Sequence, residues 1–214
     1  FWFWDPVENA SLMPWFVMTA LFHSLLVLEK RETLYYWVII LCLLTFTLSV
    51  TGTFLVRSGI LNSVHTFAND PSRGLYILIF LSIMIITSTI IFLNNFRREK
   101  YNFFINSKET FILSNNWFMM FYLGTVLIGT VYPIFTEVLN NLSISVGPPY
   151  YNSIIIPLLI PFLFLMAIGP QAKWIKNEFK KYINIIIILA ISIFANLSIS
   201  YLFGKMTVLS NLII

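Results

Sequence analysis

The chain has 214 residues, of which 58% are hydrophobic and 10% are charged, and its formal net charge is +4. Its mean hydropathy is +0.84, whereas an average soluble domain carries roughly 25% charged residues. One water-soluble core cannot bury this much apolar surface. The composition therefore excludes an ordinary soluble domain and indicates an integral membrane protein.

Residues 1–15, "FWFWDPVENASLMPW", place four aromatic residues directly before Asp5, ahead of a long apolar run. Trp residues at the membrane interface are common, and such a belt accounts for Trp15. It accounts less well for the consecutive aromatics, because a helix cannot place all of Phe1–Trp4 on one face. Two interpretations stay open, namely interface residues and a platform for a planar cofactor.

Six apolar segments follow, and most of them reach the ~20 residues that a helix needs to cross a bilayer. They are Leu12–Leu28, Tyr36–Val56, Leu75–Phe96, Trp117–Thr136, Ser153–Ile168 and Tyr182–Phe203. The fifth is the shortest and contains Pro157 and Pro161, so a re-entrant segment is an alternative there. The sequence therefore predicts an all-α membrane bundle of about six transmembrane helices, with the Trp-rich segment on its outer face.

Ten of the thirteen Lys and Arg residues fall in three connectors that this topology places on one side of the membrane. These connectors are Glu29–Tyr35, Arg97–Glu109 and Lys173–Lys181. The positive-inside rule assigns that side to the cytoplasm or matrix, so the opening stretch and the loop Arg57–Gly74 lie outside. Because the basic residues are divided among short connectors, we expect no nucleic-acid partner.

The chain divides into five predicted parts. Residues 1–15 form the Trp-rich segment, and residues 12–96 form a three-helix membrane unit. A basic inner loop follows at 97–116, then three further membrane helices at 117–203 and an outer end at 204–214. The chain lacks an initiator Met and stops soon after its sixth crossing, so we expect one piece of a larger protein. The single cysteine, Cys42, excludes an internal disulfide.

The chain contains two histidines. His23 lies near the middle of the first apolar segment, where an ionisable side chain is costly and faces a cavity or a partner. A neutral His bonded to a neighbouring helix and an axial haem ligand are both compatible with that position. His65 lies in the polar outer loop "RSGILNSVHTFANDPSRG", either as a solvated residue or as a ligand on the side of the Trp-rich segment.

Several stretches, in order, resemble one family, the CcmF/NrfE haem lyases. They include "WFWDPVENASLMPW", "TALFHSLLVLEKR", "GTFLVRSGILNSVHTFANDPSRG", "SISVGPPYYN" and "MAIGPQAKW". The resemblance covers most of Phe1–Trp174. It implies attachment of haem to the CxxCH motif of apocytochrome c. It also implies the partners of that reaction, which are the haem chaperone CcmE, a CcmH-type subunit and apocytochrome c itself.

The resemblance also assigns roles to individual residues. It makes His65 an axial ligand of a substrate haem b held outside the membrane. It makes His23 an axial ligand of a second haem b inside the bundle, and no other residue of the chain is expected to bind iron. The residues that it implies as the platform for the outer haem are Trp2, Trp4, Asp5, Glu8 and Asn9. The first half of the family's Trp-rich signature and a second His for each haem are absent, so another CcmF fragment or segment is expected to complete both sites.

The sequence therefore predicts a haem lyase subunit of cytochrome c maturation that is incomplete as a single chain. The alternative is a structural membrane subunit of a larger complex, for example a respiratory one, without lyase activity. A transporter is disfavoured because no inverted repeat is visible and the later apolar runs hold no buried charge. The role of the "SISVGPPYYN" loop stays open between packing over the haem site and docking a partner.

The composition is rich in Ile, Asn, Phe and Lys, which favours an organellar gene. We therefore expect the mitochondrial inner membrane, with the Trp-rich segment facing the intermembrane space. The alternative location is the bacterial cytoplasmic membrane, with that segment facing the periplasm. In both locations the lipid bilayer surrounds the chain.

Overall fold

A computed structural model describes residues 2–58, 70–97, 104–140, 144–175, 187–188, 190–192 and 198, and in this part of the chain the regular elements are all helices. Five of them are long and apolar enough to cross a membrane. They are α1 (Pro6–Arg31), α2 (Tyr35–Ser58), α3 (Pro71–Asn95), α4 (Lys108–Asn140) and α5 (Pro148–Ile168), and a short 3-10 helix, η1 (Gly169–Gln171), follows. The predicted all-α membrane fold is confirmed. The predicted sixth crossing, Tyr182–Phe203, lies largely outside the described residues.

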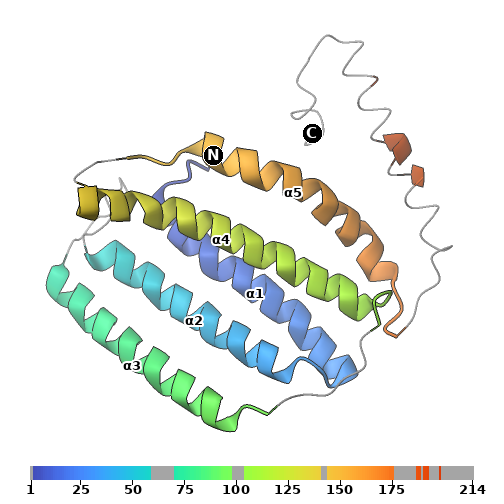
Figure 1. Ribbon diagram of the computed structural model, residues 1–214, viewed down its shortest axis with the longest axis horizontal. Coiled ribbons are helices and arrows are strands. Elements are labelled where there is room, and N and C mark those ends of the chain that lie inside the picture. The colour runs from blue at the N-terminus through green and yellow to red at the C-terminus, as the bar shows by residue number, and fades with distance from the viewer. Residues whose placement is uncertain are drawn as a thin grey trace.

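The helices lie side by side in the order α3, α2, α1, α4 and α5 (Figure 1). α1 is the third of the five helices in this order, and it packs against both α2 and α4. Its buried face includes small residues such as Ala10, Ala20 and Ser24, which allow neighbouring backbones to approach. A Cβ at Gly52 of α2 would lie 3.3 Å from the carbonyl oxygen of Ala10, so this glycine permits the close crossing.

Three of the helices contain interior prolines and remain continuous. α5 holds Pro157 and Pro161 within 21 residues of unbroken helix, α4 holds Pro133 and α1 holds Pro14. The structure therefore gives the fifth apolar segment the length of a full crossing. The re-entrant alternative is not what the described backbone forms.

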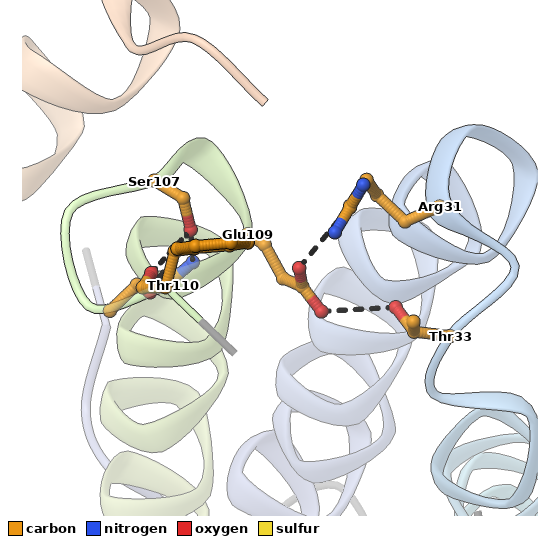
Figure 2. A network of polar contacts seen from close by, with 6 residues as sticks. Arg31, Thr33, Ser107, Glu109 and Thr110 are labelled. Carbon is orange, nitrogen blue, oxygen red and sulfur yellow. Dashed lines mark hydrogen bonds and ion pairs between the residues drawn. The ribbon is translucent and has the colours of Figure 1, made fainter. Parts of the chain in front are cut away.

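One end of the bundle is joined by a buried polar cluster around Glu109, which is 1% exposed (Figure 2). Arg31, at the end of α1, places Nε 3.5 Å from the Glu109 carboxylate, and the Thr33 hydroxyl donates to the same carboxylate at 3.0 Å. Lys108 N–H also donates to the carbonyl of Lys173 at 2.8 Å. The three basic connectors therefore meet at this end of the bundle, as far as their residues are described.

The opposite end gathers the start of α1, the end of α2, the start of α3 and the start of α5. Asp70 N–H donates to the Arg57 carbonyl at 3.0 Å, which joins α3 to α2. Trp4 meets Tyr151 of α5 at this end. The Trp-rich segment thus lies at the end of the bundle away from Glu109.

Candidate functional site

The aromatic start of the Trp-rich segment, residues 2–5, is held to the start of α1 by a capping box. Asp5 is the N-cap, and its carboxylate accepts a hydrogen bond from Val7 N–H at 3.0 Å. The Glu8 carboxylate accepts from the N–H groups of Asp5 and Phe3 at 3.3 and 3.0 Å. Pro6 stands at the first helical position, where no N–H is needed. The two carboxylates implied as part of a haem platform therefore hold the backbone of that platform.

Trp4, Asn9 and Tyr151 form a second anchor, here called the Trp4 clamp. The rings of Trp4 and Tyr151 stack with centroids 4.2 Å apart and planes 6° apart. Asn9 is 0% exposed, and its Nδ2 donates to the Trp4 carbonyl at 3.1 Å and to the Tyr151 hydroxyl at 3.0 Å. Tyr151 covers one face of the Trp4 ring, so that face is not available to a haem.

Trp4 also has an unusual backbone conformation. Its φ is 60°, in the left-handed region that a residue with a Cβ enters at a cost of roughly 1–2 kcal/mol. Such a conformation persists when surrounding contacts over-determine it. The stack and the hydrogen bond to the Trp4 carbonyl are contacts of that kind.

The side chains of Trp2 and Phe3 are 41% and 65% exposed at this end of the bundle. The ring of Trp2 meets that of Trp4 edge-on, at 6.4 Å and 82°. Exposed aromatic rings on an anchored base offer apolar area to a flat ligand. The structure therefore brings all five predicted platform residues together. The Trp2 side chain is exposed, whereas the other four residues make contacts that anchor the segment.

His65 and the rest of residues 59–69 lie outside the described residues. The described ends of that loop, Arg57 and Asp70, are joined at the same end of the bundle as the Trp-rich segment. The role of His65 as a ligand therefore stays a prediction.

His23 lies on α1, about 26 Å along the axis from Pro6 and about 12 Å from Arg31. Its Nδ1 is 2.8 Å from the carbonyl oxygen of Thr19, and because a carbonyl only accepts, Nδ1 carries the proton. Nε2 has no hydrogen-bond partner within the described part of the chain. In metal-binding histidines, one ring nitrogen donates its proton to an acceptor such as a backbone carbonyl, and the other nitrogen binds the metal. His23 thus fits a single axial ligand, on a different part of α1 from the Trp-rich segment.

Polar side chains next to His23 join three helices in the interior of the bundle. Asn116 of α4 is 2% exposed, and the amide orientation that satisfies its neighbours accepts from Ser24 Oγ at 2.6 Å and Trp37 Nε1 at 3.2 Å. In that orientation its nitrogen donates to the Ala20 carbonyl at 3.2 Å. Sequence reasoning missed Asn116 and Ser24, although a polar residue within an apolar run is a signal for such interhelical bonds.

An open groove of about 680 Å³ lies between α2 and α4 in this region. It is lined by Leu34, Trp37, Leu113, Asn116, Trp117, Met120 and Phe121. His23 is not among the lining residues. No group of three or more metal-binding side chains occurs among the described residues either, so neither feature completes a metal site around His23.

Residues 1–62 match the model of a family described as "Cytochrome C assembly protein". The chain is 45% identical over 174 residues to the cytochrome c-type biogenesis protein CcmF of Pseudomonas fluorescens, covering 81% of this chain and 26% of that protein. It is 43% identical over 193 residues to CcmF of Escherichia coli, covering 89% and 30%, and 42% identical over 183 residues to NrfE of Haemophilus influenzae, covering 84% and 28%.

A solved structure titled "Cytochrome c Heme Lyase CcmF" also matches, with a TM-score of 0.66 and 25% identity. It covers 95% of this chain and 29% of the solved chain. The chain therefore spans between a quarter and a third of the length of the curated relatives that it matches.

Proposed function

We propose that this chain, which belongs to the CcmF/NrfE family, is a membrane subunit of a haem lyase in cytochrome c maturation. The observation that carries the proposal is the Trp-rich segment, which lies within the matched residues 1–62 and presents exposed Trp2 and Phe3 on an anchored base. Because the chain spans less than a third of its relatives, the complete reaction requires further protein.

In the proposed reaction the outer haem is the substrate. Trp2 and Phe3 pack against its apolar faces, while the capping box and the Trp4 clamp hold their backbone. His65 binds the iron and so sets which edge of the haem faces the apocytochrome. A cysteine thiol of CxxCH then adds across a haem vinyl group. The sulfur bonds to one vinyl carbon and the proton goes to the other, which requires near-attack geometry.

The second proposed haem, a resident haem b, would be held by His23 through Nε2. When bound, this haem would supply electron transfer toward the outer site. The chain's own contribution is to fix the ligand: the Thr19 carbonyl holds the proton on Nδ1, and the Ser24 and Asn116 contact holds α1 against α4. A further residue to hold this haem would come from a segment outside this chain.

The proposed partners are the remaining CcmF segment or fragment, a CcmH-type subunit, CcmE and apocytochrome c. The relatives named above support a role in the cytochrome c maturation system, and five apolar helices support a membrane protein. We propose the mitochondrial inner membrane as its location. The bacterial cytoplasmic membrane is the alternative, which fits the bacterial relatives.

The experiment is a haem spectrum of the complex purified through an affinity tag on this chain, with c-type cytochromes measured in the same membranes. We expect protohaem in the complex. Replacing His65 by Ala should lower c-type cytochromes at least tenfold, while Thr66→Ala in the same loop should not. A haem-free complex, or unchanged cytochromes with a stably produced His65→Ala variant, would contradict the proposal and favour a structural subunit.

A further inference from the structure

The "SISVGPPYYN" loop brings Tyr151 to the Trp-rich segment. Gly147 is the N-cap of α5, and prolines stand in the first turn, where their fixed φ suits a helix start. Tyr151 follows within that turn and is 1% exposed. We infer that Tyr151 is a positioning residue, which holds the Trp-rich segment in the shape that captures haem. This inference rests on the proposed function above.

The Tyr151 side chain serves the clamp with both its ring and its hydroxyl. The ring covers one face of Trp4 at 4.2 Å. The hydroxyl accepts from Asn9, 142 residues away in the chain. A side-chain amide has two N–H donors, and Asn9 directs its Nδ2 to the Trp4 carbonyl and to Tyr151. One buried amide thus connects the backbone of the Trp-rich segment to the tyrosine that stacks on it.

The conformation of Trp4 explains why such a clamp is needed. A φ of 60° is unfavourable for tryptophan, so the segment alone would relax to an ordinary extended or helical conformation. A change in the backbone of Trp4 would redirect Trp2 and Phe3, which precede it in the chain. The contacts from Tyr151 and Asn9 oppose the relaxation. The direction of the exposed rings therefore depends on a residue of α5.

Gly129 of α4 provides the space for Tyr151. A Cβ at Gly129 would lie 2.6 Å from the Tyr151 hydroxyl oxygen and 2.8 Å from two ring carbons, closer than real contacts allow. The ring cannot move aside freely, because it also contacts Trp4, Tyr150 and the buried Asn9. Gly129→Ala therefore disturbs the clamp from the opposite side. The same change raises the intrinsic helix propensity of α4, so loss of helix would not explain its effect.

The test compares Tyr151→Phe, Tyr151→Leu and Gly129→Ala in the tagged complex. The matched control is Phe162→Leu, another buried aromatic of α5, which packs against Phe118 and Tyr122. Haem bound at the outer site is measured by absorbance in a His23→Ala background, which removes the proposed membrane haem. Mobility of the segment is measured without haem, by electron paramagnetic resonance of a spin label at Phe3→Cys with the exposed Cys42 replaced by Ser.

We expect Tyr151→Leu and Gly129→Ala to increase label mobility and to lower outer haem at least fivefold. Tyr151→Phe keeps the stack and should retain most of both signals, while Phe162→Leu should change neither. Unchanged mobility in Tyr151→Leu, or an equal haem loss in Phe162→Leu, would overturn the inference. If the unsubstituted complex binds no haem but Tyr151→Leu still frees the label, the proposed function fails and the positioning of the segment stands.

Discussion

The side-chain amide of Asn116 lies 2.6 Å from the hydroxyl of Ser24, the residue that follows His23 on α1. α1 carries both proposed haem contacts, the Trp-rich segment at its start and His23 farther along. Its position is set at three levels, by Tyr151 at one end, Asn116 in the interior and Glu109 at the other end. Substitutions at each level lead to distinct expectations.

Replacing Asn116 by Leu should destabilise the bundle by about 1 kcal/mol, the scale of an interhelical hydrogen bond in a membrane. The change leaves Trp37 Nε1 without its acceptor, while the Ser24 hydroxyl can turn its proton to the Ala20 carbonyl, 2.8 Å away. Thermal unfolding of the complex in detergent measures the effect. Thr87→Val, on the exposed face of α3, is the control, and an equal loss in both variants would show that Asn116 has no special role.

Replacing His23 by Ala should remove at least nine-tenths of the haem b bound inside the bundle, because Nε2 has no hydrogen-bond partner among the described residues and is available as a ligand atom. Added imidazole should restore part of the spectrum by occupying the vacated position. Phe22→Leu is the control, since Phe22 is 62% exposed and touches the His23 ring only edge-on. Haem content and reduction potential equal to those of the unsubstituted complex would rule out His23 as the ligand.

Replacing Trp2 by Leu should weaken capture of the outer haem roughly fivefold, since one aromatic contact is worth about 1 kcal/mol. Trp15→Leu is a close control, because Trp15 is 51% exposed on α1 but lies outside residues 2–5. Haem titration of the complex in a His23→Ala background, followed by absorbance, gives the affinity. Equal weakening in both variants would mean that Trp2 acts only as an interface residue.

Replacing Glu109 by Ala should destabilise the protein by about 3 kcal/mol, because it leaves Arg31 without its carboxylate in a largely buried position. The double replacement Arg31→Met and Glu109→Leu should recover much of this loss, since no buried charge remains. Glu29→Ala, which breaks the exposed pair with Lys30, should hardly change the unfolding temperature. If Glu109→Ala and Glu29→Ala unfold at the same temperature, the buried pair does not stabilise the fold.

Labelling of single cysteines from the two sides of the membrane tests the topology. With Cys42 replaced by Ser, cysteines at Phe3 and Arg73 should react from one side and a cysteine at Lys30 from the other. All three positions are exposed, so reagent access does not limit the result. Modification of positions 3 and 73 from opposite compartments would exclude the arrangement.

The helices of the structure extend beyond the apolar segments that predicted them. α1 begins at Pro6, ahead of Leu12, because the capping box satisfies its first N–H groups. α4 begins at Lys108, ahead of Trp117, because its first turns are polar and lie at the buried Glu109 cluster. Hydropathy identifies the residues that lie in the hydrocarbon. A helix can extend beyond those residues where caps or polar contacts satisfy the backbone groups at its ends.

The sequence by itself determined the class of the protein, five of its crossings and the resemblance that led to the proposed function. Long apolar runs leave the chain few alternatives to helices in a membrane, so local composition is sufficient for these conclusions. It also placed Trp2, Trp4, Asp5, Glu8 and Asn9 in one functional segment, and the structure brings them together.

Only the tertiary structure decided which of those residues anchor the segment and which of them is exposed to a ligand. The "DPVE" pattern is readable as a capping box, yet the sequence does not show that Trp4 is covered while Trp2 is open. That division depends on Tyr151, 142 residues from Asn9, and on Gly129, whose missing Cβ leaves room for the tyrosine ring. Stacking and side-chain hydrogen bonds act over a few ångströms between helices, and linear spacing does not encode which distant pair will meet.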